Sequence, residues 1–215
     1  MDLRMKPLIR LASAALAIGV AIATPLAASA TTQERFSVAG TGADAIFTTC
    51  PNGPVPDQVC TLALIGVSSQ VTKPDGTKTS ETTLSIGIDT FKIDLSGNFV
   101  SISTTAGFGV PTWSIDTRLT RASATASFAV ITCTGDVCVD GTMTVVASWT
   151  GQGDLLHDVS NFHVSKGPFS ANFHFNGNTR LASASATFNG QDLGASFFAD
   201  MRNVKSGDIL ICHGC

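Results

Sequence analysis

The chain of 215 residues is 44% hydrophobic and 13% charged, with thirteen Phe, two Trp, no Tyr and a formal net charge of −3. This composition excludes a disordered chain, which would carry more charge and fewer apolar residues. It also argues against nucleic-acid binding, because phosphate contacts depend on Lys and Arg, and only 13 of these are present.

The first thirty residues predict a secretory signal peptide (1–30). Arg4, Lys6 and Arg10 form a basic start, an apolar run follows, and Ala28-Ser29-Ala30 supplies the small residues of a cleavage site. We therefore expect a secreted mature chain, 31–215, that folds as a single domain. No later apolar run is long enough to cross a bilayer as a helix, so no transmembrane segment is expected.

Most of the mature chain alternates apolar with small polar residues, which is the period-two pattern of half-buried strands. Leu84–Asp89 and Phe99–Ser103 are examples. Turn signals such as Pro74-Asp75-Gly76 and Ser96-Gly97-Asn98 separate about ten to twelve such strands. The sequence therefore predicts an all-β fold, either an antiparallel β-sandwich or a closed β-barrel.

An internal repeat, 36–115 and 118–215, is one reading of the strand pattern. Ala45–Cys50 followed by Val59-Cys60 resembles Phe128–Cys133 followed by Val137-Cys138. Shared Ala, Ser and Thr composition would produce the same resemblance without duplication, so both readings stay open.

All six Cys lie in the mature chain, and an even number in an exported protein predicts disulfides. Each neighbouring pair brackets a turn-rich stretch, so we expect local bridges: Cys50 with Cys60, Cys133 with Cys138, and Cys212 with Cys215. The last pair also has the spacing of a redox dithiol or of half a zinc site. A strand-like segment before it and an oxidising compartment favour the disulfide over both alternatives.

Three His lie in a segment that resembles a β-hairpin. A turn at Lys166-Gly167 would place Phe162 opposite Ala171, His157 opposite Asn176, and give one apolar face: Phe162, Phe169, Phe173 and Phe175. The other face would carry His163 and His174 among Asn and Ser. His157, diagonal to His174, would then form with it the candidate metal site. Nearby third donors are Asn amides, which bind zinc or copper poorly, so a solvated polar face is the alternative.

No catalytic motif is present. The chain lacks Gly-x-Ser-x-Gly and His-Glu-x-x-His, and Asp89 and Asp94 would lie on opposite faces of a strand. We therefore do not expect an enzyme, and we assign no catalytic residue and no cofactor. Trp113 and Trp149 could be ligand platforms, but Trp149 shares a strand face with Val145 and Ala147, which favours core packing.

Together these features predict a secreted, non-catalytic β protein with a surface, adhesion or partner-binding role. One alternative is a β-barrel carrier of a small apolar ligand, since thirteen Phe could line a cavity. The other alternative is an extracellular metal-binding protein or enzyme. The expected partner is accordingly an unknown protein, an envelope component or a small apolar ligand.

Overall fold

The protein is built from strands. The computed structural model describes residues 32–74, 77–166 and 169–213, and none of these residues forms a helix able to cross a membrane. The strands are β1 (Thr32–Thr48), β2 (Val59–Pro74), β3 (Thr79–Ile93), β4 (Phe99–Gly109), β5 (Thr112–Ile115), β6 (Arg121–Thr134), β7 (Val137–Gly151), β8 (Leu156–Lys166), β9 (Phe169–Phe188), β10 (Gln191–Ala195) and β11 (Phe198–His213).

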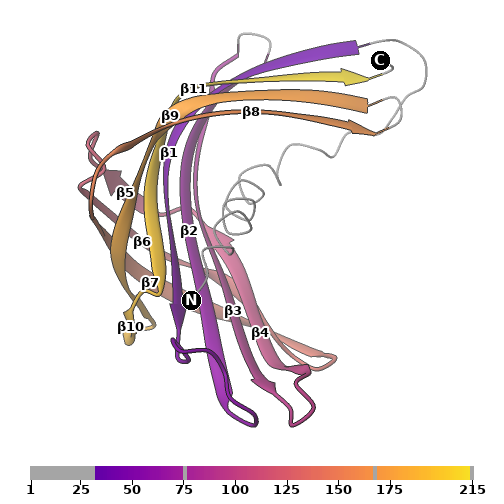
Figure 1. Cartoon of the computed structure of the whole chain (residues 1–215), viewed down its shortest axis with the longest axis vertical. Helices are drawn as coiled ribbons and strands as arrows, with labels where there is room; N and C mark the ends of the chain where they lie inside the picture. Colours follow the sequence, from indigo (N-terminus) through magenta and orange to yellow (C-terminus); the bar gives the residue numbers. More distant parts are fainter. Residues whose placement is uncertain (1–31, 75–76, 167–168, 214–215) are drawn as a thin grey trace.

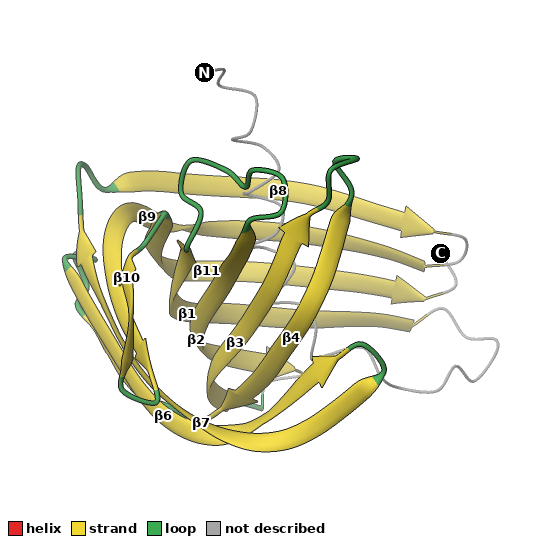
Figure 2. Cartoon of the chain, turned by 90° about the horizontal axis from the view of Figure 1, so that it is seen from below, coloured by secondary structure: helices red, strands yellow, loops and turns green. Residues whose placement is uncertain are grey.

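The strands form one antiparallel sheet that closes into a ring. Neighbours follow the order β9, β11, β1, β2, β3, β4, β6, and β7 then pairs with both β6 and β9, so the path returns to its start (Figure 2). β5, β8 and β10 each pair with a strand of this path but are not themselves part of it. The predicted all-β, antiparallel class is confirmed.

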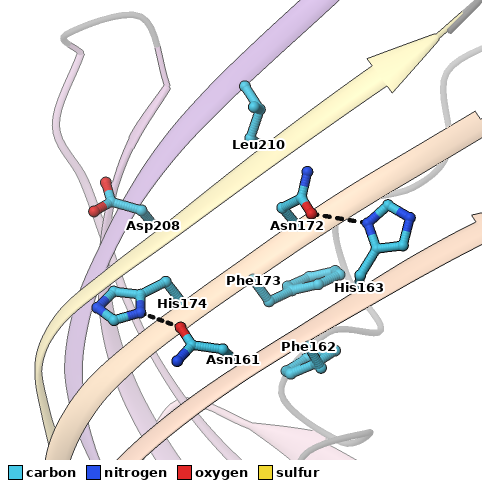
Figure 3. Close-up of a pocket in the computed structure, with 8 residues that line it drawn as sticks. All are labelled: Asn161, Phe162, His163, Asn172, Phe173, His174, Asp208 and Leu210. Atoms are coloured by element: carbon cyan, nitrogen blue, oxygen red, sulfur yellow. Dashed lines mark hydrogen bonds between the residues drawn. The ribbon is translucent and has the colours of Figure 1, made fainter.

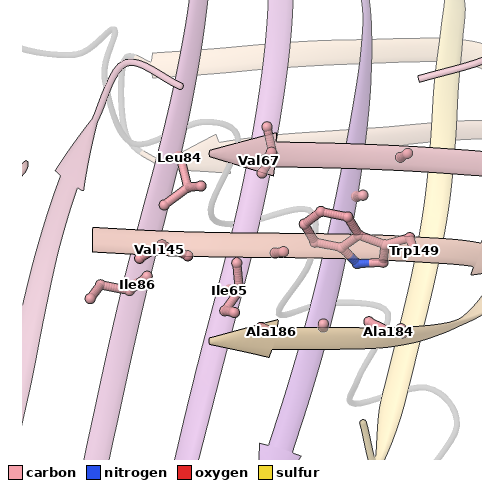
Figure 4. Packing of buried hydrophobic residues seen from close by; sticks show 14 of the residues in the cluster. Ile65, Val67, Leu84, Ile86, Val145, Trp149, Ala184 and Ala186 are labelled. Atoms are coloured by element: carbon pink, nitrogen blue, oxygen red, sulfur yellow. The ribbon is translucent and has the colours of Figure 1, made fainter. Parts of the chain in front are cut away.

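Along the strands of the ring, side chains point alternately to its inside and to its outside. In β6 every second residue from Ala122 to Val130 is buried, whereas the Ser and Thr between them are exposed. This alternation places the apolar side chains inside, as the period-two pattern predicts. The ring interior is filled, and Trp149 packs there in one cluster with Val145 and Ala186 (Figure 4).

Trp149 is only 1% exposed, and its Nε1 donates a hydrogen bond to the backbone oxygen of Asp44 at 3.0 Å. The half-buried Trp113 meets it edge to face, with ring centroids 6.0 Å apart. The prediction that Trp149 belongs to the core is therefore confirmed.

Two disulfides tie hairpins together. Cys50 and Cys60 connect the end of β1 to the start of β2, with Cα atoms 5.6 Å apart. Cys133 and Cys138 bridge the β6–β7 hairpin with Cα atoms 4.0 Å apart. Both predicted pairs are confirmed, and they are compatible with an extracellular protein. Cys215 of the third predicted pair and the predicted signal peptide lie outside the described residues.

Several strands continue past the ring. Figure 1 shows β1, β11, β9 and β8 running together on one side of it. We call this part the extension; it consists of β8 and of residues 169–177, 206–213 and 32–38, which pair in that order.

Two glycines on either side of a valine form a row across the sheet where the extension leaves the ring. Gly177, Val204 and Gly40 are direct neighbours across β9, β11 and β1, and both ladders shift register beside this row. A Cβ atom on Gly177 would lie 2.0 Å from the backbone oxygen of Asn203, and one on Gly40 would lie 2.3 Å from that of Ser69. Because only glycine allows backbones to approach so closely, these residues permit the bend.

Candidate functional site

An open hollow lies on the extension, where β8, β9 and β11 run side by side (Figure 3). It has a volume of about 580 Å³ and is lined by Asn161, Phe162, His163, Asn172, Phe173, His174, Asp208 and Leu210. Amide and imidazole groups dominate its polar lining. The hollow therefore offers Asn and His hydrogen-bonding groups and the Asp208 carboxylate beside apolar side chains.

His157, His163 and His174 each pair with an Asn directly across the β8–β9 ladder. The Nδ1 of His163 lies 2.8 Å from Oδ1 of Asn172, and His174 makes the same contact with Asn161. His157 and Asn178 form the third pair, at 3.3 Å.

An amide oxygen can only accept, so in each of these pairs the hydrogen bond is donated by the imidazole Nδ1. Its Nε2 and the Asn Nδ2 hydrogens are then left for further partners. We call the side of the extension that carries these pairs the polar face.

The opposite side of the extension carries stacked phenyl rings. Phe162 and Phe173 face each other across the ladder, and their ring centroids lie 4.4 Å apart. Phe175 continues the stack, with centroids 6.4 Å from Phe173. We call this side the phenyl face; Phe173 and Phe175 are half-buried there, outside the ring core. The predicted apolar face is thus confirmed for these three Phe, whereas the Phe169 side chain lies outside the description.

The register of the hairpin differs from the predicted one by two residues. Lys166 pairs with Phe169 as the last pair of the ladder, so Phe162 lies opposite Phe173 instead of Ala171. Pro168 explains the difference, because it has no backbone N–H to donate and fits a turn better than a ladder position. The predicted turn at Lys166-Gly167 would have placed this proline in the ladder.

The new register separates the two candidate metal ligands. His157 lies opposite Asn178 instead of Asn176, four positions along β9 from His174. Asp208 lies opposite His174 on β11 and accepts a hydrogen bond from Ser37 Oγ at 3.3 Å. Within the described ranges no three His, Cys, Asp or Glu side chains gather around a possible metal position. The structure therefore does not bring His157 and His174 together.

A second polar cluster joins β1 and β11 on the outer side of the ring. Asp44 and Asp200 are direct neighbours, and Nη2 of Arg202 lies 2.5 Å from Oδ2 of Asp44. Burial is the main cause that raises the pKa of Asp200 to about 6, and the Asp44 carboxylate adds to it. Burial also raises the pKa of Asp44, although Arg202 opposes this shift. The only sequence signal was an acid between Ala43 and Ala45, because β1–β11 pairing cannot be read from the chain.

Replacing Asp200 by Asn should stabilise the protein above pH 6 and have little effect near pH 4. The folded protein binds the Asp200 proton more tightly than the unfolded chain, whose Asp titrates near 3.8. The stability that the protonated Asp200 contributes is fully present below pH 3.8 and is lost as the pH rises through about 6. The loss is at most about 3 kcal/mol.

Thermal melts of the wild type and Asp200→Asn at pH 4 and pH 7.5 measure this effect. Asp136→Asn, in the exposed β6–β7 turn, serves as the control and should melt like the wild type at both values. Equal melting of Asp200→Asn and wild type at pH 7.5 would show that the Asp200 carboxylate is not penalised by burial.

Comparison with known proteins does not identify a family. No family model matches the chain, and no curated protein matches it. An acetoacetate decarboxylase-like enzyme from Sphingomonas wittichii RW1 is similar at 8% identity and TM-score 0.31, over 90% of this chain and 96% of that one. A protein assigned as AttH from Nitrosomonas europaea is similar at 11% identity and TM-score 0.26, over 92% of this chain and 57% of that one. At these TM-scores neither likeness bears on function.

Proposed function

We propose that this chain is an exported, non-catalytic binding protein that docks a protein partner along strand β8 of the extension. The observation that carries the proposal is the free outer edge of β8. Within the described residues β8 pairs with β9 alone, so the N–H and C=O groups on its other side have no strand partner. Such an edge can accept an added strand from another protein.

The composition of β8 fits a binding edge better than a protected one. Natural sheet edges are usually short or carry Lys, Pro or a bulge that prevents pairing. β8 has 11 residues and no Pro, its one Lys is the last residue, Lys166, and its ladder with β9 has no register shift. It also exposes apolar side chains on both faces: Val159 is 50% exposed on the polar face, and Val164 is 44% exposed on the phenyl face.

The other sheet edges and the ring interior are less suited to binding a partner. β5 and β10, which also lie outside the ring path, have only four and five residues. The ring interior is filled by side chains such as Trp149 and Phe47, so a small apolar ligand inside it is the less supported alternative.

Selection from a displayed library of ten-residue peptides tests the proposal. Wild-type protein should enrich peptides that alternate apolar and polar residues, because such peptides match both faces of an added strand. Val159→Lys, which introduces a charge in the middle of the edge, should abolish the enrichment. Hydrogen exchange should show new protection of β8 amides when an enriched peptide is bound.

Val139→Lys is the matched control, because Val139 is a 60% exposed valine of β7, away from the extension. It should enrich the same peptides as the wild type. Enrichment that survives Val159→Lys, or no enrichment by the wild type, would contradict docking along β8.

A further inference from the structure

We infer that the partner strand is β8 of a second copy of this chain, which pairs antiparallel with Phe162 opposite Phe162. This inference rests on the proposed docking along β8. β8 is the outermost strand of the extension (Figure 2), so a second copy can approach it from the side. Each possible register of the two strands would bring a different set of side chains together.

The polar face matches itself in this register. It places His163 opposite Asn161 of the second copy, and therefore repeats the His–Asn pairing that the chain already makes three times across β8 and β9. The atoms left over are complementary. His163 uses Nδ1 toward Asn172, and in the neutral ring Nε2 is then an acceptor. Asn161 uses Oδ1 toward His174 and retains two Nδ2 hydrogens, one of which can be donated to that Nε2.

The phenyl face matches itself in the same register. Phe162 stacks on both Phe173 and Phe175, with ring centroids 4.4 and 6.2 Å away, and as the β8 member of this cluster it is 37% exposed. Phe162 of the second copy would continue this stack across the new ladder and would remove both rings from water. Stacked aromatic pairs contribute beyond their buried area, so the contact favours this register over one without it.

Neighbouring registers lose both contacts. A shift of two residues in one direction places Phe162 opposite Ser160 and His163 opposite Val159. A shift in the other direction places Phe162 opposite Val164 and His163 opposite His163. A shift of one residue would turn the second strand over, so that the polar face of one copy would continue into the phenyl face of the other. The Phe162-centred register is thus the one that satisfies both faces of the extension.

The expected dimer is weak and depends on concentration. The paired ladder would contain about nine residues of each strand and extend roughly 30 Å. An interface of that size is at the small end of those found in stable complexes, so we expect a Kd on the order of micromolar.

Sedimentation equilibrium of the exported chain over a wide concentration range tests self-association. The wild type should form dimers, and Phe162→Lys should weaken them at least about tenfold, because two charges would meet in the paired register. Val164→Lys, a second variant of the same edge, should also weaken them. Phe108→Lys is the control, because Phe108 is 74% exposed on β4; it should dimerise like the wild type. Circular dichroism melts establish that each variant is folded.

Electron–electron distance measurement tests the register. A nitroxide attached through Leu156→Cys, a position 52% exposed at the start of β8, should lie about 40 Å from its counterpart in the dimer. A register shifted by two residues would change this distance by about 7 Å, and such a result would overturn the Phe162-centred pairing.

A wild type that stays monomeric to millimolar concentration, or dimers unaffected by Phe162→Lys, would overturn self-pairing. If that monomer still enriches peptides through β8, the proposed function stands and only the identity of the partner is wrong. If it enriches none, both proposals fail.

Discussion

Replacing Gly177 by Ala should destabilise the protein by about 3 kcal/mol or more. The added Cβ would lie 2.0 Å from the backbone oxygen of Asn203, so the β9 and β11 backbones would have to separate. Backbone atoms cannot rotate away as a flexible side chain can, and the ladder bonds beside the bend would lengthen. Chemical denaturation of wild type and variant measures the change in the free energy of unfolding.

Gly87→Ala provides the control within the same sheet. A Cβ on Gly87 would meet no heavy atom within 4 Å, and β3 is regular there. Its unfolding free energy should stay within about 0.5 kcal/mol of the wild type. If Gly177→Ala unfolds like Gly87→Ala, close backbone approach does not determine the bend.

Trp149→Ala should cost about 3 to 5 kcal/mol. Trp149 is the largest fully buried side chain among the described residues, and Ala would leave a cavity in the middle of the ring. The small Ala residues around it cannot fill that space. The variant would also remove the Nε1 donor from the backbone oxygen of Asp44. The midpoint of guanidinium unfolding, followed by far-ultraviolet circular dichroism, measures the cost.

Trp113→Ala tests whether the stability lost in Trp149→Ala depends on the buried position of Trp149 rather than on removing any Trp. Trp113 is half-buried and packs against the edge of the core, with Nε1 3.3 Å from Oγ1 of Thr41. Its removal should cost clearly less than that of Trp149, because less area leaves the protein interior. Equal costs would mean that the ring core is not centred on Trp149.

Much of the fold could be predicted from the chain alone because the interior of the ring is apolar and its outside carries Ser and Thr. The regular alternation in β6, from Ala122 to Val130, leaves one choice of buried face. The hairpins with Cys50 and Cys133 could be predicted for a similar reason, since each Cys has a nearby partner across a turn.

The candidate site was harder to predict because it depends on register and on distant pairing. The predicted hairpin contained the right strands, but its observed register differs by two residues, which changes the partners of His157, His163 and His174. The continuation of the sheet past the ring could not be predicted, because it depends on where neighbouring backbones approach at Gly40 and Gly177. The Asp44–Asp200 contact joins the first and last strands, and local patterns do not reveal such a pairing.

The pairing of β1 with β11 has a consequence for how the protein folds. Thr32 lies opposite His213, so the ring cannot close until β11 has been synthesised. Hairpins such as β2–β3 and β6–β7 need only local contacts and can form early, whereas closure pairs strands that lie far apart in the sequence and should be slow. Until then the edges of β1 and β9 are open to other chains.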